Sequence, residues 1–293
     1  MIAKKDQQLN RDSNNLYMPK LHTCIFCLKE SDEFNIIEHI VPESLGNTED
    51  LLTNAVCDKC QNYFGKEIES FVLSKTPFGF WKTVSGTKNK KDKLPYFDAS
   101  QTNAKSGRLK NFHPYTDNGI TIYPVNNESI IEVSIKDDAM LEQILSGKKT
   151  QFNLVLTPKM LIYIGRFLGK VALEYWCKEF GDNVLDTRFN ELRHYVRYGT
   201  TDSMWPILRG QLSENILQYK IINGFEEEQT LYSYSFLKAE KSGTIVFTFD
   251  VGCERYGIIL NYKNPDSNIF TEQLLSALCK GTNGLPDILF YNL

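Results

Sequence analysis

The sequence predicts an α+β protein in which a small N-terminal module is followed by a larger mixed α/β domain with an antiparallel sheet. Three observations lead to this prediction. Two Cys-x-x-Cys pairs lie about thirty residues apart near the N-terminus. An apolar segment at 160–176 predicts a buried central helix, because it is apolar on most helical faces. Alternating apolar and polar residues in the last third predict an antiparallel meander with one packed face.

Composition limits the classes of protein to consider. The chain has 293 residues, enough to bury a sizeable core in one large domain or two. The net charge of −3 gives no global electrostatic signal for nucleic acid, so any binding surface must be a local patch. No apolar run reaches the length of a membrane span, and the N-terminus lacks the apolar segment of a signal peptide. We therefore expect a cytoplasmic protein that does not contact a membrane.

The cysteines predict a zinc site. Four of the seven cysteines form the two pairs, and an odd count with paired knuckles fits metal thiolates in a reducing compartment better than disulfides. Zn²⁺ takes thiolates presented in pairs by tight turns, so a tetrahedral site with a structural role is expected. Its ligands would be Cys24, Cys27, Cys57 and Cys60.

A carboxylate–histidine pair, Glu38-His39, lies between the two knuckles. The flanking apolar residues of 34–41 predict a strand that runs into a turn at Pro42 and then a loop. After the second knuckle, apolar residues at helical spacing predict a helix from Asn62 onward. The expected order is therefore knuckle, strand, loop, knuckle and helix.

This order of motifs resembles the HNH endonuclease family, in the branch whose ββα-metal finger is supported by a structural zinc on four cysteines. The resemblance covers roughly residues 24–70 and rests on the two Cys-x-x-Cys pairs, on Glu38-His-Ile-Val-Pro-Glu-Ser-Leu-Gly46, and on the Gln-Asn-Tyr-Phe-Gly that follows Cys60. It implies a zinc-supported HNH module and a divalent-metal nuclease that hydrolyses phosphodiester bonds. DNA is the expected substrate by analogy with the family.

The resemblance also implies a role for each site residue. Glu38 would be a ligand of a catalytic Mg²⁺ or Mn²⁺, and His39 the general base that activates water, since imidazole titrates near neutral pH. Asn54 would orient the histidine. The family places Asn or His after the fourth cysteine as second metal ligand, whereas this chain has Gln61 followed by Asn62. Either amide could serve; Asn62 is preferred because a shorter side chain is easier to hold rigidly.

Other interpretations of these residues stay open. The four cysteines could hold a zinc ribbon that only stabilises a fold, and His39 could be a half-buried strand histidine with a satisfied hydrogen bond. The competing class of protein is a non-catalytic zinc module that binds nucleic acid or a protein partner. Gln61 at the position where the family has Asn or His supports this non-catalytic alternative, because it leaves the second ligand of the catalytic metal in question.

The first 118 residues divide into a polar flexible arm at 1–20, the HNH nuclease module at 21–75, and a basic loop or linker at 76–118. The basic stretch is the strongest local positive patch. It could hold a nucleic-acid backbone beside the active site, or act only as a solubilising loop. The candidate phosphate contacts are Lys66, Lys88, Lys90 and Lys91.

Residues 119–293 predict a mixed α/β domain of unknown specificity, for sensing, recognition or oligomerisation. Thr157-Pro158 is typical of a helix start, and that helix is expected to end at Gly181. A second helix at 186–198 carries several Arg and His residues that either bind phosphate or pair with nearby glutamates. The other expected strands are at 120–125, 129–135, 231–236, 244–251, 256–262 and 287–291, and the other helices at 138–145 and 269–279. A homo-oligomer or a regulatory partner could use this domain, and a nuclease joined to such a domain suggests bacterial defence.

Overall fold

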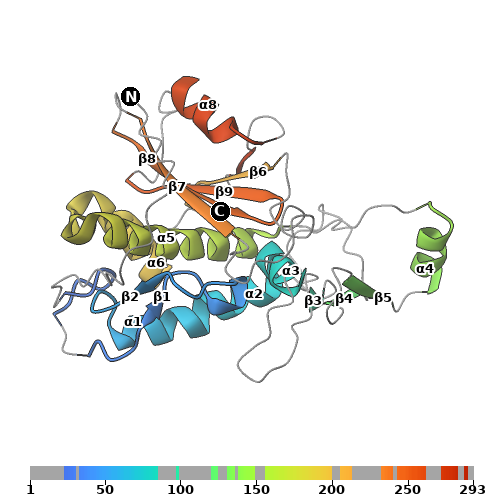
Figure 1. Cartoon of the computed structure of the whole chain (residues 1–293), viewed down its shortest axis with the longest axis horizontal. Helices are drawn as coiled ribbons and strands as arrows, with labels where there is room; N and C mark the ends of the chain where they lie inside the picture. Colours follow the sequence, from blue (N-terminus) through green and yellow to red (C-terminus); the bar gives the residue numbers. More distant parts are fainter. Residues whose placement is uncertain are drawn as a thin grey trace.

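The computed structural model is a mixed α+β structure, as the sequence predicts (Figure 1). It has both helices and antiparallel sheets, with the knuckle module near the N-terminus. The residues it describes are 23–30, 33–84, 97–98, 120–124, 131–135, 138–148, 156–199, 205–212, 232–239, 243–261, 272–282 and 287–289. The N-terminal arm at 1–20 lies outside them.

The module forms a ββα unit. Strand β1 (Glu38–His39) pairs antiparallel with β2 (Leu51–Leu52), so that Glu38 faces Leu52 and His39 faces Leu51. A short 3-10 helix, η1 (Glu43–Leu45), lies between them. Strand β1 is shorter than the predicted strand because the Asp58 carboxylate accepts the backbone N–H groups of Asn35 and Ile36, which removes these residues from strand pairing.

One long helical stretch begins inside the second knuckle, four residues before the predicted start. It consists of α1 (Asp58–Tyr63), a π-helical segment η2 (Phe64–Glu69) and α2 (Ser70–Lys75). The buried residues Phe64, Ile68 and Val72 follow the predicted spacing. A π-helical turn accommodates one extra residue, and such turns are frequent at functional sites.

Part of the expected basic linker is regular structure. Helix α3 (Pro77–Val84) begins at a proline, which suits the first helical turn, and it buries Phe78 and Trp81. Strand β3 (Phe97–Asp98) pairs with β4 (Ile120–Pro124), and β4 pairs with β5 (Ile131–Ile135). The two later strands and helix α4 (Asp138–Leu145) lie where the sequence predicts them.

Helix α5 (Pro158–Phe180) is the central element. The Thr157 hydroxyl accepts the Met160 backbone N–H at 3.2 Å, which is the predicted N-cap, and the helix ends at Gly181. Short 3-10 helices, η4 (Gly181–Leu185) and η5 (Thr187–Phe189), lead to α6 (Asn190–Tyr198), where the sequence predicts one longer helix. A Cβ atom at Gly169 would lie 2.5 Å from Val196, so the glycine permits the close approach of α5 and α6.

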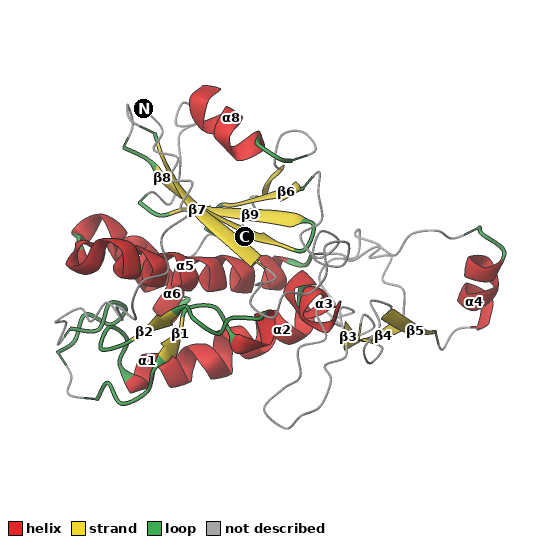
Figure 2. Cartoon of the chain, viewed as in Figure 1, coloured by secondary structure: helices red, strands yellow, loops and turns green. Residues whose placement is uncertain are grey.

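The C-terminal part contains a five-stranded antiparallel sheet in the order β10-β6-β9-β8-β7. Strands β7, β8 and β9 form the predicted meander, and α8 is the predicted helix at 269–279 (Figure 2). Every residue of β8 is buried, because α5 covers one face and Val246 on the other face belongs to a second buried cluster that includes Leu278 of α8. The expectation of one packed face is wrong for this strand. The bounds are β6 (Ile207–Gln211), β7 (Tyr232–Lys238), β8 (Ile245–Val251), β9 (Glu254–Ile259), α8 (Glu272–Cys279) and β10 (Asp287–Leu289).

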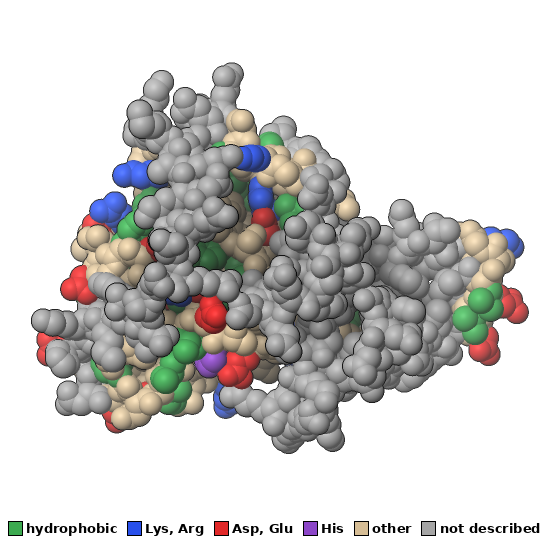
Figure 3. All heavy atoms as spheres, in the orientation of Figure 1, with side chains coloured by type: hydrophobic (Ala, Val, Ile, Leu, Met, Phe, Trp, Pro, Cys, Tyr) green, Lys and Arg blue, Asp and Glu red, His purple; other side chains and the backbone are tan. Residues whose placement is uncertain are grey.

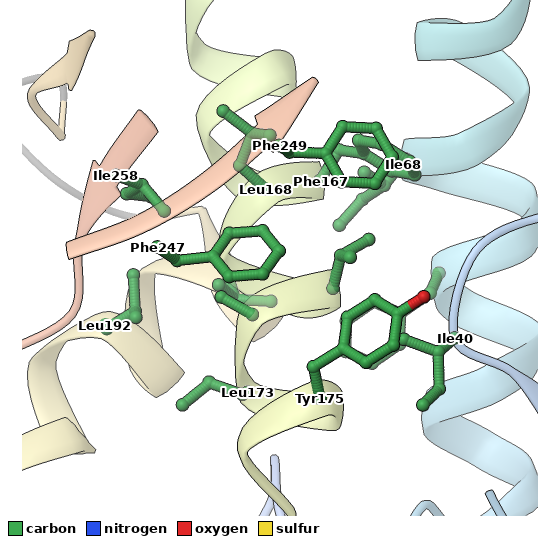
Figure 4. Packing of buried hydrophobic residues seen from close by; sticks show 14 of the residues in the cluster. Ile40, Ile68, Phe167, Leu168, Leu173, Tyr175, Leu192, Phe247, Phe249 and Ile258 are labelled. Carbon is green, nitrogen blue, oxygen red and sulfur yellow. The ribbon is translucent and has the colours of Figure 1, made fainter. Parts of the chain in front are cut away.

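A continuous hydrophobic core joins the module to the sheet. The cluster of buried residues extends from Cys24 to Leu260 and passes through α5. Figure 4 shows side chains of α5 between Phe247 and Phe249 of β8 and Ile40 and Ile68 of the module. The module therefore rests on α5, which the sheet covers from the other side (Figure 1).

Among the described residues, no helix has the length and apolar character needed to cross a bilayer.

Candidate active site

The loop between β1 and β2 is held by one buried amide. Asn47 donates through Nδ2 to the carbonyl oxygens of Val41 and Asp50, at 2.6 and 3.1 Å. Its Oδ1 accepts the backbone N–H groups of Glu49 and Asp50. These four bonds close the loop after the Pro42 turn and fix the position of Glu38 and His39 on β1.

The two residues of β1 have different environments. Glu38 is buried, with 7% of its surface exposed, whereas the His39 side chain is 34% exposed. His39 Nε2 lies 3.2 Å from Glu43 Oε1, and its Nδ1 is enclosed and without a hydrogen-bond partner in the described structure. A carboxylate only accepts, so Nε2 carries the proton and Nδ1 the lone pair when the ring is neutral.

Both residues open into one surface cleft of about 340 Å³. Its rim includes the apolar residues Ile36, Ile37 and Pro42. The described residues that line the cleft include no lysine or arginine. Figure 3 shows one face of the molecule, on which a histidine has acidic, hydrophobic and basic side chains beside it. The polar residues that line the cleft include Glu38, His39, Glu43, Gln61, Asn62 and Glu69.

A fully buried lysine from α5 lies below the cleft. Lys170 Nζ is 2.6 Å from Glu38 Oε1, 2.9 Å from Glu69 Oε1 and 3.1 Å from Glu174 Oε2. It also lies 3.4 Å from the carbonyl oxygens of His39 and Ile40. Glu174 is held by charge rather than by hydrogen-bond geometry, because neither of its oxygens has a hydrogen-bond partner among the described residues.

Burial and charge oppose each other in this cluster. Burial raises the pKa of Glu38, and the Lys170 ammonium opposes the rise. Burial also holds the pKa of Glu174 well above its usual range. Burial alone would lower the pKa of Lys170, but the surrounding carboxylates outweigh it and raise that pKa well above the usual value. Lys170 is therefore charged at neutral pH.

The two amides after Cys60 are held differently. Gln61 is buried, and its Nε2 donates to the carbonyl oxygens of Ile36 and Val56 at 2.9 and 3.0 Å. Both amide hydrogens are thus used, which leaves Oε1 as a free acceptor. Asn62 is exposed and no hydrogen bond of its side chain to another described residue fixes it.

The four knuckle cysteines come together as predicted. Their sulfur atoms all lie within 4.8 Å of one another, and the Sγ atoms of Cys27 and Cys57 are 3.9 Å apart. Tetrahedral zinc with Zn–S bonds of about 2.3 Å needs sulfurs roughly 3.8 Å apart, so the cluster fits the ion. The hydrogen bond with Cys60 lowers the pKa of Cys24 to about 5, and burial raises the pKa of Cys57 to about 11.

Two arginines of helix α6 bind the cysteine knuckles. Arg197 donates through Nε to Cys60 Sγ at 3.3 Å, and its guanidinium lies 4.0 Å from the centre of the Tyr63 ring. Arg193 is buried and donates to the Ile25 carbonyl oxygen at 2.6 Å. Of the two roles expected for this helix, phosphate binding or pairing with glutamates, neither describes these two arginines, which bind the knuckles instead. Arg188 pairs with Asp186.

The geometry of a ββα unit, a thiolate cluster and a carboxylate–histidine cleft agrees with the comparison of the sequence with family models. Residues 24–76 match the family model for HNH endonuclease. No curated protein and no solved structure matches the chain. The HNH match thus covers the module and ends before α3.

The remaining predicted residues of the HNH site are not gathered at the cleft. Asn54 is exposed, adopts a left-handed backbone with φ 57°, and is not among the residues that line the cleft. Lys66 is exposed and lies 3.7 Å from Glu67. The other three candidate phosphate contacts, Lys88, Lys90 and Lys91, lie outside the described residues.

The sequence analysis assigned no role to three residues that the structure brings to the candidate site, Glu43, Glu69 and Lys170. A signal for one of them was available. Lys170 and Glu174 stand four residues apart in a strongly apolar helix, and charged residues are almost never fully buried unless they are paired.

Proposed function

We propose that this protein is a metal-dependent HNH endonuclease that hydrolyses phosphodiester bonds in DNA. The observation that carries the proposal is the shared cleft of Glu38 and His39 on a ββα unit that also carries a four-cysteine cluster suited to zinc. The lining of this cleft is acidic, with Glu38, Glu43 and Glu69. Such a cleft repels a phosphate unless a cation is present, which favours metal-dependent chemistry over a purely acid–base mechanism.

His39 is the proposed general base. The Glu43 carboxylate accepts the N–H group of His39 Nε2 and so keeps the lone pair on Nδ1. Nδ1 then takes a proton from the attacking water. Because Nδ1 is enclosed in the structure, a small rotation of the ring when substrate enters is part of the proposal. In this proposal Glu43 has the orienting role for which the sequence suggested Asn54.

The donor set suits a hard divalent ion, Mg²⁺ or Mn²⁺. Glu38 offers carboxylate Oε2, and Gln61 offers amide Oε1 at the far end of a side chain fixed by two hydrogen bonds. We therefore propose Gln61 rather than Asn62 as the second ligand. Asn62 was preferred from the sequence because a short side chain is easier to hold rigidly, but the two hydrogen bonds of Gln61 hold its longer side chain rigid. When bound, the ion would supply Lewis-acid stabilisation of the phosphate and the leaving oxygen.

A cleavage assay tests the function. The full chain is incubated with supercoiled plasmid and Mg²⁺ or Mn²⁺, and with single-stranded DNA and RNA in parallel. We expect nicking of plasmid by wild type and a loss of about 100-fold or more in His39→Ala, the usual contribution of a general base. His194→Ala, which changes an exposed histidine outside the cleft, is the matched control. Equal cutting by His39→Ala and wild type would refute the role of His39. Absence of cutting by wild type on every substrate would favour a binding module.

A further inference from the structure

Helix α5 lies outside the matched residues 24–76, yet it contributes a charged group to the cleft floor. Lys170 has no exposed surface, and its ammonium contacts one carboxylate from β1 and one from the π-helical segment. Both of these carboxylates, Glu38 and Glu69, line the cleft. The lysine therefore ties two residues of the cleft to a helix encoded far downstream.

The contacts of Glu38 divide between its two oxygens. Oε1 lies 2.6 Å from Lys170 Nζ, whereas Oε2 has no hydrogen-bond partner among the described residues. A carboxylate that is clamped through one oxygen can turn only slightly, so the other oxygen keeps a fixed place. The carbonyl oxygens of His39 and Ile40, each 3.4 Å from the same ammonium, fix the lysine relative to the strand that carries Glu38.

We propose that Lys170 is a positioning residue of the nuclease site, which fixes the Glu38 carboxylate for the catalytic divalent ion from helix α5. This inference rests on the proposed function, because it takes Glu38 as a metal ligand. It adds that the metal site of the module is completed by a residue about 130 positions away, beyond the part that matches HNH endonucleases.

Two possible roles of Lys170, charge balance and positioning, predict opposite changes in metal affinity when the lysine is removed. A positive charge beside Glu38 repels an incoming cation, so its loss would tighten metal binding if the lysine did nothing but balance charge. Positioning predicts weaker binding, because partners that orient a metal ligand typically contribute 10- to 100-fold in affinity. The sign of the change in metal affinity therefore separates the two roles.

The experiment measures Mn²⁺ affinity of the zinc-loaded full chain by electron paramagnetic resonance, without substrate. We expect Lys170→Met to raise the Kd for Mn²⁺ by about 10- to 100-fold, with an unchanged zinc content. Lys178→Met is the matched control, since Lys178 lies on the same helix and pairs with Asp50 of the module but does not touch the cleft. Glu174→Gln removes the deepest carboxylate and keeps the Lys170 contacts to Glu38 and Glu69. Both controls should stay within about twofold of wild type.

Removing a fully buried ammonium can prevent folding, so a second variant carries the same test. Lys170→Met combined with Glu174→Gln removes the buried ammonium together with the acid most deeply buried beside it, and leaves Glu38 and Glu69 in place. An equal or lower Kd for Mn²⁺ in the folded Lys170 variants would overturn the inference, as would an equal loss in Lys178→Met. A wild-type protein that binds no Mn²⁺ would instead refute the proposed function.

Discussion

Replacing Asp50 tests how firmly the N-terminal module is attached to the rest of the chain. Its carboxylate accepts the hydroxyl groups of Tyr175 and Tyr232 at 2.6 and 2.8 Å, and lies 2.6 Å from Lys178 Nζ. One side chain of the module thus binds both α5 and β7. We predict that Asp50→Ala destabilises the protein markedly.

The magnitude follows from these contacts. A hydrogen bond to a charged group contributes about 1.5–3 kcal/mol, and the partly exposed Lys178 pair about 1 kcal/mol or less. The three bonds share one carboxylate and do not add fully, so we expect a loss of about 3 kcal/mol in the free energy of unfolding. With an unfolding entropy of about 2.1 cal/mol/K per residue, this corresponds to a fall of roughly 5 °C in Tm for a chain of this size.

Urea and thermal unfolding at pH 7 measure the effect. Glu49→Ala is the control, because this neighbouring carboxylate is exposed and makes no side-chain hydrogen bond to another described residue; its change should stay within about 0.5 kcal/mol. An Asp50→Ala protein as stable as the Glu49→Ala protein would show that the bonds seen for Asp50 contribute nothing.

The same variant has a defined pH dependence. Burial raises the pKa of Asp50, but hydrogen bonds from Lys178, Tyr175 and Tyr232 outweigh it, and the net shift is downward. A depressed pKa stabilises the fold above the unfolded value of about 3.9, and this contribution is lost as pH falls through the folded pKa. The difference between wild type and Asp50→Ala should therefore persist from pH 7 to pH 5 and shrink below about pH 4.

Two further predictions concern metals. Gln61→Ala should weaken Mn²⁺ binding by about 10-fold or more while Asn62→Ala leaves it nearly unchanged, measured by paramagnetic resonance; the reverse order would restore Asn62 as the ligand. Elemental analysis should find about one zinc per chain, and Arg197→Leu, which removes the N–H···S bond to Cys60, should release that zinc to a chelator several-fold faster. Arg188→Leu is the control for this variant, and a folded, zinc-free wild type would contradict the site itself.

Local signals in the sequence predicted much of this molecule. The cysteine pairs predicted the thiolate cluster because each pair is formed by a tight turn, and Thr157-Pro158 predicted the start of α5 because capping depends on neighbouring residues. Strand β6 was not predicted, since it is short and depends on pairing with β9 and β10. The spacing of Lys170 to Glu174 could have marked the lysine as a buried, paired charge, but its contact with Glu38 could not be predicted, because the two residues are distant in sequence and no periodic pattern connects them.

The π-helical segment η2 between α1 and α2 sets the directions in which Gln61 and Glu69 point around the helix axis. Gln61 and Glu69 are eight residues apart, which in a regular α-helix would leave them about 80° apart around the axis. One extra residue in η2 reduces the effective spacing to about seven residues and the offset to roughly 20°. The bulge therefore acts as an alignment device that brings an amide and a carboxylate to one side. Straightening this segment into regular α-helix without removing a residue would turn Glu69 through about 100°, away from its lysine, whereas deleting one residue would keep the offset of roughly 20°.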